Sequence, residues 1–378
     1  MRTELPPFLS QKFRFWSFVC MFLLVFVHGY NVEPRYLQPW TLPTDPLTPT
    51  AWVQYLLANG LLRFRIPMLF IISGYLFALH DAQPHGPRIR KRARTLLVPY
   101  LIWSAFALLL TFLLEEQPWM RAGIAHSHVA QIDDARLLLH EYRWYELVLR
   151  WLFAPVAYQL WFVRVLFIYN LAYPLILRAV TRKTGRYAFF AVAVLLWLLT
   201  FNLGFVEGEG LLFFALGVWI QKSGFGIDSP RPWLNPTAWL MAFVALAAVK
   251  TWFAFQGESL LGNGVYPLLT LLHKATVVSG LIACWYGSDD IVRWFMARPW
   301  FTWLSAFAFM IYALHAPLVA YFIDASIDAL QPLPGARMLA FILLPLAVIA
   351  LCVATGAALR RVAPGLYGLL TGGRGLGN

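Results

Sequence analysis

Runs of predominantly apolar residues recur along almost the whole chain, and they constrain its fold more than any other feature. About 17–25 such residues are enough to cross the hydrocarbon of a bilayer. Of the 378 residues, 60% are hydrophobic and only 13% are charged, which is more apolar surface than a soluble domain can bury. The sequence predicts an all-α, polytopic membrane protein with about ten transmembrane helices. The runs are 13–31, 60–80, 95–114, 159–178, 187–204, 208–222, 236–255, 265–286, 300–322 and 338–360.

Lysine and arginine are unevenly distributed among the connections between these runs. One alternate set of connections is basic, and the other is poor in basic residues and carries most of the acidic ones. Because cytoplasmic loops are enriched in Lys and Arg, both termini are expected in the cytoplasm. The even number of spans agrees with this, since it puts both ends on the same side. The long segment 115–158, of mixed charge, is expected outside with a short amphipathic piece near Tyr142–Phe153.

The chain is expected to form a single membrane domain over residues 1–362. The Gly-rich segment 363–378 is predicted to be a disordered cytoplasmic tail. The three cysteines all fall in apolar runs, which favours core packing over disulfides. The net charge of +12 is explained by cytoplasmic loops, so no nucleic acid partner is expected. The sequence has no P-loop, no Gly-x-Ser-x-Gly elbow and no Cys/His metal spacing, and no metal site is expected.

Several ionisable residues lie inside the apolar runs or at their ends. A charge there is costly unless it finds a partner or lines a cavity, so a functional interpretation is the default. A rise of about 1.5 Å per residue places them at a similar depth, toward the outer side. One shared polar cavity is the simplest explanation. Its members are His28, Arg63, Arg65, Arg164, His273, Lys274 and His315, with Trp161 beside Arg164.

Structural alternatives exist for several of these residues. A neutral His28 bonded to a backbone carbonyl, an Arg63 that reaches the outer headgroups, and an Arg164 paired with a loop carboxylate would need no chemistry. His273 and Lys274 are adjacent, so they are expected to point to different faces of one helix.

Other polar or small residues favour structural roles more clearly. Tyr312 and His315 share a helix face, as a structural pair or as ligand contacts, and Pro317 is expected to kink that helix. Ser73-Gly74 is predicted to be a small-residue packing patch. Glu207 and Glu209 are predicted to lie in a solvated turn.

Basic residues crowd the connection after the second run. Five of the seven residues at 88–94 are basic: Arg88, Arg90, Lys91, Arg92 and Arg94. A phosphate-bearing ligand would be well held there, although the same loop is also explained by membrane orientation alone.

Five segments resemble the bacterial integral-membrane acyltransferase family 3. LLVFVH at 23–28 is like the family's first helix with its essential histidine. RIPMLFIISGYL at 65–76 resembles the "VPLFFxxSGYL" stretch, and RTLLVPYLIW at 94–103 is similar to the start of its third helix. LWFVRVL at 160–166 is similar to "LWFLxxL", and IYALHAP at 311–317 to "YxxHxP".

The resemblance implies an O-acyltransferase of the bacterial inner membrane. Its donor would be acyl-CoA (acetyl-CoA or succinyl-CoA) as co-substrate, with no permanently bound cofactor. Its acceptor would be a sugar hydroxyl of an extracytoplasmic glycan or lipid-linked precursor. His28 is expected as general base and Arg65 as the group that stabilises negative charge. Contacts to substrate are expected from Arg63, Trp161, Arg164, Tyr312 and His315.

Donor binding is expected at Arg14, Arg90, Arg92 and Arg94. The family commonly has an arginine eleven residues before the histidine, where this chain has Ser17. Either Arg14, one turn earlier, takes that role or this chain lacks it. The acyl group would reach the outer half by a pantetheine arm threaded between helices or by an acyl-enzyme relay.

Membrane lipids and a homodimer are further expected partners. A transporter or flippase for an anionic glycan or lipid is the main rival function. A non-catalytic partner in a glycan-synthesis complex is the second.

Overall fold

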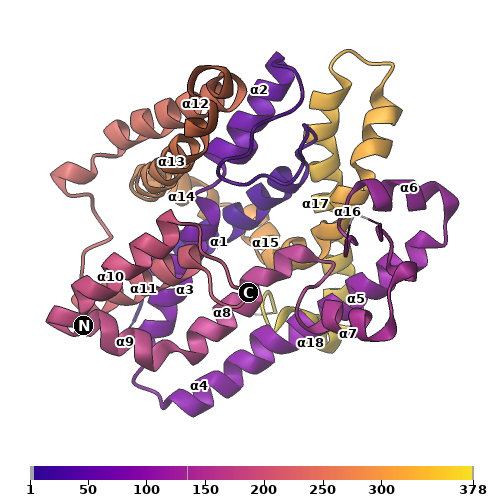
Figure 1. Cartoon of the computed structure of the whole chain (residues 1–378). Helices are drawn as coiled ribbons and strands as arrows, with labels where there is room; N and C mark the ends of the chain where they lie inside the picture. The colour runs from indigo at the N-terminus through magenta and orange to yellow at the C-terminus, as the bar shows by residue number, and fades with distance from the viewer. Residues whose placement is uncertain (1–3, 134, 377–378) are drawn as a thin grey trace. The chain divides into compact units, whose positions relative to one another are not determined.

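The computed structural model describes residues 4–133 and 135–376, and these contain helices and connections but no β-strand. The one isolated bridge joins Asn202 and Glu207. The all-α prediction is therefore confirmed. The chain forms two compact units, each assembled from segments far apart in sequence (Figure 1). Unit 1 comprises residues 1–23, 32–89 and 168–302, and unit 2 comprises residues 24–31, 90–167 and 303–378.

Unit 1 contains most of α1 (Pro7–His28) and a series of further helices. They are α2 (Pro49–Tyr55), the π-helical η1 (Leu56–Leu61), α3 (Arg65–Leu79), the first part of α4 (His85–Arg92), α9 (Tyr173–Thr181), α10 (Lys183–Leu198), α11 (Gly208–Ser223), α12 (Pro236–Leu261), α13 (Val265–Gly287) and α14 (Asp289–Met296). Short 3-10 turns are η5 (Pro232–Leu234) and η6 (Gly262–Gly264).

Local sequence explains where these helices begin and end. Pro236 occupies the first turn of α12, and the Asn235 side chain accepts hydrogen bonds from the amides of Thr237 and Ala238 at 3.0 and 3.2 Å. Gly224 ends α11 in the left-handed conformation, at φ 66°. α12 and α13 pack side by side along their length (Figure 1).

α3 and α11 pack closely because both carry glycine at the contact. A Cβ at Gly74 would overlap the carbonyl oxygen of Phe214, and one at Gly217 would overlap that of Ile71. Such close backbone approach is typical of small-residue contacts between membrane helices. The predicted packing patch at Ser73-Gly74 is confirmed for Gly74.

Unit 2 contains the last turn of α1 and the helices that follow α4. They are η2 (Ala93–Leu97, π-helical), α5 (Val98–Glu115), α6 (Pro118–His126), η3 (Leu139–Glu141), α7 (Trp144–Leu152), η4 (Tyr158–Leu160), most of α8 (Trp161–Leu171), part of α15 (Pro299–Ser305), α16 (Ala308–Leu330), α17 (Ala336–Val362) and α18 (Pro364–Thr371). α16 packs along α17, with Gly335 (φ 76°) in the turn between them (Figure 1).

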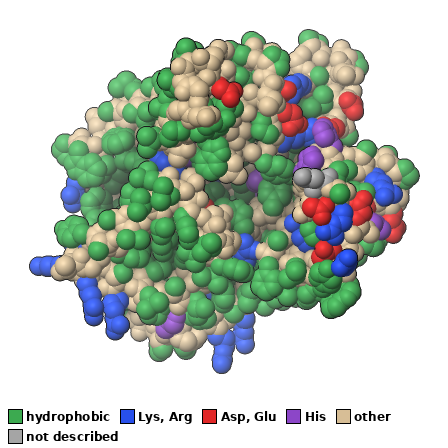
Figure 2. Space-filling model, in the orientation of Figure 1, with side chains coloured by type: hydrophobic (Ala, Val, Ile, Leu, Met, Phe, Trp, Pro, Cys, Tyr) green, Lys and Arg blue, Asp and Glu red, His purple; other side chains and the backbone are tan. Residues whose placement is uncertain are grey.

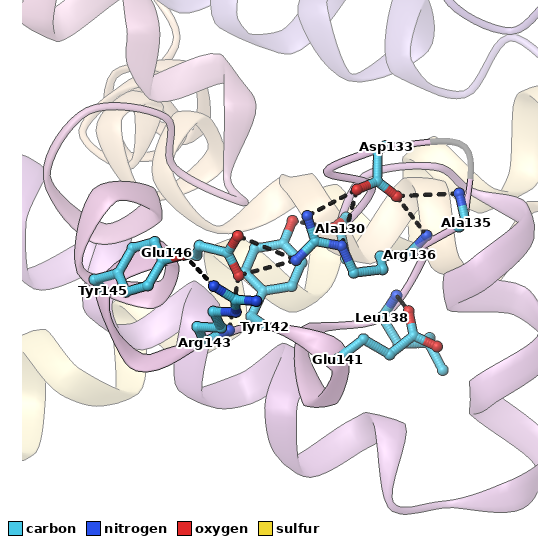
Figure 3. Close-up of polar contacts among 10 residues, drawn as sticks. All are labelled: Ala130, Asp133, Ala135, Arg136, Leu138, Glu141, Tyr142, Arg143, Tyr145 and Glu146. Carbon is cyan, nitrogen blue, oxygen red and sulfur yellow. Dashed lines mark hydrogen bonds and ion pairs between the residues drawn. The ribbon is translucent and has the colours of Figure 1, made fainter.

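Charged side chains hold the segment between α5 and α8 together (Figure 3). Arg136 pairs with Asp133 at 2.7 Å and with Glu146 at 3.1 Å. The hydrogen bond from Arg136 holds the pKa of the Asp133 carboxyl below its usual range. The amphipathic piece expected near Tyr142–Phe153 is α7 and is confirmed.

The membrane-spanning helices agree with the predicted runs, with differences in detail. Among the described residues, six helical segments are long and apolar enough to cross a membrane, and a pair bent by 65°, α8 with α9, makes a possible seventh. One of the six, Pro236–Gly287, contains both α12 and α13. α10 and α11 have 16 residues each, fewer than the ~20 that a span usually needs. The count of ten and the cytoplasmic termini stay predictions.

Hydrophobic side chains cover much of the face seen in Figure 2. Leu175, Leu199 and Leu203 are each about two-thirds exposed or more, at 71%, 67% and 70%. Apolar exposure on this scale is typical of surfaces that contact lipid.

The expected disorder of residues 363–378 is wrong for most of the segment. Pro364–Thr371 forms α18, because Pro364 suits the first helical turn and Tyr367 and Thr371 are buried against unit 2. The Trp103 indole donates to the Leu370 carbonyl at 2.9 Å, which ties α18 to α5. The single domain over 1–362 stays a prediction.

Enlarging Gly74 should destabilise unit 1. Gly74→Ala forces the backbones of α3 and α11 apart, with an expected cost of about 1–3 kcal/mol or more. Thermal unfolding in detergent measures the loss. The matched control is Gly86→Ala in α4, where a Cβ would meet nothing within 4 Å. Equal melting temperatures for the two variants would contradict the packing argument.

Candidate active site

His28 lies in the last turn of α1, in the part of this helix that belongs to unit 2. The adjacent Gly29 is required by packing, because a Cβ there would lie 2.7 Å from the Pro345 ring. His28 Nδ1 and the hydroxyl of Tyr158 are 2.7 Å apart, and the two rings meet edge to face with centroids separated by 4.8 Å. The Tyr158 side chain thus helps to hold the histidine.

A second imidazole lies beside the first. The ring centroids of His28 and His315 are 5.2 Å apart. His315 is fully buried in α16, with Nδ1 2.8 Å from the Ile311 carbonyl oxygen. A carbonyl only accepts, so Nδ1 carries the proton in that bond, and Nε2 of neutral His315 carries the lone pair. The structure therefore brings two of the predicted residues together.

The helix that carries His315 is broken next to it. Ala316 has non-helical φ/ψ of −105°/139°, and Pro317 has no amide proton to give to the preceding turn. The Gln159 side-chain amide replaces the missing donors and bonds the carbonyls of Tyr312, Ala313 and Ala316 at 3.2, 3.1 and 3.2 Å. The expected kink is confirmed.

The contact between η4 and α16 is reciprocal. The Tyr312 hydroxyl donates to the Gln159 carbonyl at 2.7 Å, and both residues are almost fully buried. Gln159 directly follows Tyr158, so these bonds fix the backbone that carries the Tyr158 hydroxyl to His28. Tyr312 thereby helps to position Tyr158, and its expected contact to substrate stays a prediction.

Trp161 and Arg164 lie on α8, both half-buried. Arg164 is within hydrogen-bonding reach of the Tyr100 hydroxyl, which itself donates to the Leu152 carbonyl at 2.9 Å. The guanidinium thus lies near the start of α5. Contacts of Trp161 and Arg164 to a substrate stay predictions.

The arginines that open the second predicted run lie in unit 1. Arg63 donates to the Leu37 carbonyl at 2.8 Å, and the buried Arg65 donates to the Leu62 carbonyl at 2.6 Å. Carbonyl oxygens partly offset the cost of these buried guanidinium groups. Their roles toward substrate stay predictions.

A buried lysine that sequence reasoning missed lies near Arg63. Lys250 on α12 donates to the Asn59 carbonyl at 2.5 Å and contacts His273 Nδ1 at 3.1 Å. Arg63 is within electrostatic range of both groups. A single lysine in the seventh apolar run was the available signal. The structure thus places the expected intramembrane groups as two clusters, one in each unit, and a cavity shared by both stays a prediction.

Lys274 points away from its neighbour His273, as expected. Its ammonium lies over the Trp197 ring at 4.9 Å, and the Trp197 indole donates to Glu209 at 3.1 Å. Glu207, just before α11, is within electrostatic range of Glu209 and Lys274. Burial, followed by repulsion from Glu209, raises the pKa of Glu207 to about 8 although Lys274 opposes the shift. The prediction of a solvated turn is therefore wrong, because α10 and α13 cover these carboxyls.

The residues expected to bind the donor also belong to both units. Arg14, in unit 1, donates to the Thr302 carbonyl at 2.6 Å. Arg90 and Arg94 are exposed and Arg92 is half-buried, all in unit 2. Arg88 of the same basic loop points inward, where it bonds the Phe77 carbonyl and lies 3.9 Å from the Phe77 ring. Arg88 therefore has a structural role, and the other three remain candidates.

Comparison with known proteins shows which family this chain belongs to. The family described as "Acyltransferase domain" matches residues 15–357. The chain belongs to this family. It is also 27% identical over 361 residues to "Succinoglycan biosynthesis protein ExoH" of Rhizobium meliloti (strain 1021), across 93% of this chain and 89% of that protein. No solved structure matches.

The resemblance read from the sequence motifs is thus confirmed, and the protein is an acyltransferase with a multi-pass membrane architecture. Two of the residues around His28, Tyr158 and Gln159, had no place in that resemblance. The region that the family matches includes both.

Removing the Tyr158 hydroxyl should slow acyl transfer. Tyr158→Phe keeps the ring against His28 but loses the bond to Nδ1, so the imidazole is no longer fixed. We expect kcat to fall about tenfold or more, as for loss of one hydrogen bond to a charged group, with little change in melting temperature. Tyr187→Phe, at an exposed tyrosine on α10, is the control. Unchanged kcat in Tyr158→Phe would contradict a positioning role.

The raised pKa of Glu207 predicts a pH-dependent stability. The folded protein keeps this carboxyl protonated up to about pH 8, whereas the unfolded chain releases the proton near the ordinary value of 4.5. The stability that the protonated Glu207 contributes is therefore complete below the pKa of this carboxyl in the unfolded chain. It is lost as pH rises through the pKa of the same carboxyl in the folded protein. The melting temperature of Glu207→Gln should fall less between pH 5 and pH 9 than the melting temperature of the unsubstituted protein.

Thermal unfolding in detergent at the two pH values measures this difference. Glu258→Gln, at an exposed glutamate of α12, is the control and should leave the drop unchanged. The same drop in Glu207→Gln as in the unsubstituted protein would show that Glu207 titrates normally.

Proposed function

We propose that this chain transfers an acyl group, acetyl or succinyl, from acyl-CoA to a sugar hydroxyl of an extracytoplasmic glycan or lipid-linked precursor. The proposed site of action is a bacterial inner membrane. The observation that carries the proposal is the His28 imidazole, half-buried and bonded through Nδ1 to Tyr158, in a chain of the acyltransferase family. The similarity to a succinoglycan biosynthesis protein supports a glycan as acceptor.

The proposed step uses His28 Nε2, the ring nitrogen that does not take part in the bond to Tyr158. Nε2 accepts the proton of the sugar hydroxyl as the oxygen attacks the thioester carbonyl carbon. The new C–O bond forms, the C–S bond breaks, and the departing CoA thiolate takes the proton from the imidazolium. The Tyr158 hydroxyl accepts the hydrogen bond of Nδ1–H throughout this step.

Nε2 of His315 would hold the acceptor hydroxyl near His28. With Nδ1 donating to the Ile311 carbonyl, the Nε2 lone pair is an acceptor for a hydroxyl. A sugar hydroxyl held by this acceptor would lie near His28, since the two rings are neighbours. Arg65 stays the proposed source of positive charge for the developing oxyanion, and Arg63, Trp161 and Arg164 stay proposed substrate contacts.

Replacing His28 should abolish acyl transfer. His28→Ala removes the base, and a loss of about 10²–10⁴-fold in kcat is expected. Release of free CoA thiol by purified protein, with an acceptor glycan present, measures the rate. His80→Ala, at an exposed histidine whose Nδ1 bonds the Leu76 carbonyl, is the matched control.

The same variant separates the rival function. A transporter or flippase would release no CoA, and glycan translocation into vesicles would not depend on a proton acceptor at His28. Acyl transfer that survives in His28→Ala would contradict the proposed base, and translocation without any CoA release in the unsubstituted protein would contradict the proposed enzyme.

A further inference from the structure

The C-terminal segment 364–376 lies beyond the residues matched by the family, yet it packs into unit 2. After α18, Gly372 adopts the left-handed conformation (φ 62°), and a Cβ there would overlap the carbonyl oxygen of Thr95 in η2. Gly375 (φ 78°) approaches the Ala306 carbonyl equally closely. Only glycine permits both the conformation and the contact. The segment is thus seated between η2 and the start of α16.

This segment carries Arg374, whose guanidinium contacts residues of η2 and α16. Its Nη1 donates to the carbonyls of Thr95 and Thr371 at 2.8 and 2.9 Å, and the guanidinium lies over the Phe309 ring at 4.8 Å. All three partners are uncharged. Within residues 4–133 and 135–376, no carboxylate forms an ion pair with Arg374.

Other cations lie near this position. Arg92 is within electrostatic range of Arg374, and Arg360 donates to the Gly375 carbonyl at 3.1 Å. We call these three residues, Arg92, Arg360 and Arg374, the tail cluster. Burial, followed by repulsion from Arg92, lowers the pKa of Arg374 to about 10. Like charges held together in this way are stabilised when an anion binds between them.

One face of α16 leads from the tail cluster to the two imidazoles. Phe309, Tyr312 and His315 are spaced by three residues, so they share a helix face, and about 9 Å of axial rise separates the first from the last. Phe309 contacts Arg374, Tyr312 bonds Gln159, and His315 adjoins His28. An acyl-CoA donor has phosphates at one end and a reactive thioester at the other. Its phosphates would lie at the tail cluster and its thioester near the two imidazoles.

We propose that the C-terminal segment completes the donor site, and that Arg374, together with Arg92, binds phosphate groups of the coenzyme A moiety. This inference rests on the proposed function for the identity of the donor. It adds a residue outside the matched region to the basic loop already expected to bind the donor. A purely structural role, in which Arg374 only joins α18 to η2, is the alternative.

Two measurements on the full-length purified protein test the inference. Calorimetric binding of coenzyme A needs no catalysis, and Arg374→Gln should weaken it by about tenfold to a hundredfold. Steady-state kinetics should show the same rise in KM for acyl-CoA with kcat unchanged. KM for acyl-pantetheine, which has the thioester but no phosphate, should not change.

Two further variants sharpen the result. Arg374→Lys keeps a positive charge and should restore part of the affinity, which a role limited to the geometry of the guanidinium bonds would not produce. Arg361→Gln removes an exposed arginine that neighbours Arg360 in sequence and should leave coenzyme A binding unchanged.

Failure of this inference differs from failure of the proposed function. Equal coenzyme A affinity in Arg374→Gln and the unsubstituted protein would overturn the inference, as would an equal rise in KM for both thioesters. Coenzyme A binding that depends on Arg374, without acyl transfer to any acceptor, would support the phosphate site and count against the proposed reaction.

Discussion

The amide of Gln159 holds the candidate site together. Pro317 and the non-helical Ala316 leave carbonyls of α16 without helical donors in a region where water is scarce, and buried carbonyls must find hydrogen bonds. Gln159 supplies them, and Tyr312 returns a bond to the Gln159 backbone. These reciprocal hydrogen bonds between Gln159 and α16 determine the position of Tyr158, and Tyr158 in turn orients His28.

The same requirement explains how arginine is accommodated across both units. Arg14, Arg63, Arg65 and Arg374 each donate to a backbone carbonyl. A carbonyl oxygen accepts the hydrogen bond without neutralising the cation, so Arg374 keeps its positive charge in unit 2. That charge suits the phosphates of the proposed acyl-CoA donor, whereas a carboxylate partner would cancel it.

The sequence predicted the helical class, the approximate helix positions and the kink at Pro317, because runs of apolar residues and a proline inside a helix are local signals. The motif at the end of the first run also pointed to His28 as a candidate. His28 and His315 were also expected to meet, since both fell at one depth. Tyr158 and Gln159 were missed because a short turn before a helix has no periodic signal, and their role depends on a carbonyl freed 150 residues later in the chain. Lys250 and α18 were missed for a related reason: each owes its place to a tertiary contact, with Asn59 and with Trp103 respectively.

The two imidazoles are held by different kinds of partner. The Ile311 carbonyl can only accept, so Nδ1 of His315 carries a proton in that bond. The Tyr158 hydroxyl can either donate or accept, and in the proposed step it accepts from Nδ1–H of His28. A general base must gain and lose a proton in each turnover without losing its orientation. Both rings meet this requirement, because a proton can come and go at Nε2 while the bond at Nδ1 persists. The proposal therefore gives the proton transfer to His28 because of its resemblance to the family's essential histidine, and it gives the holding of the acceptor hydroxyl to His315.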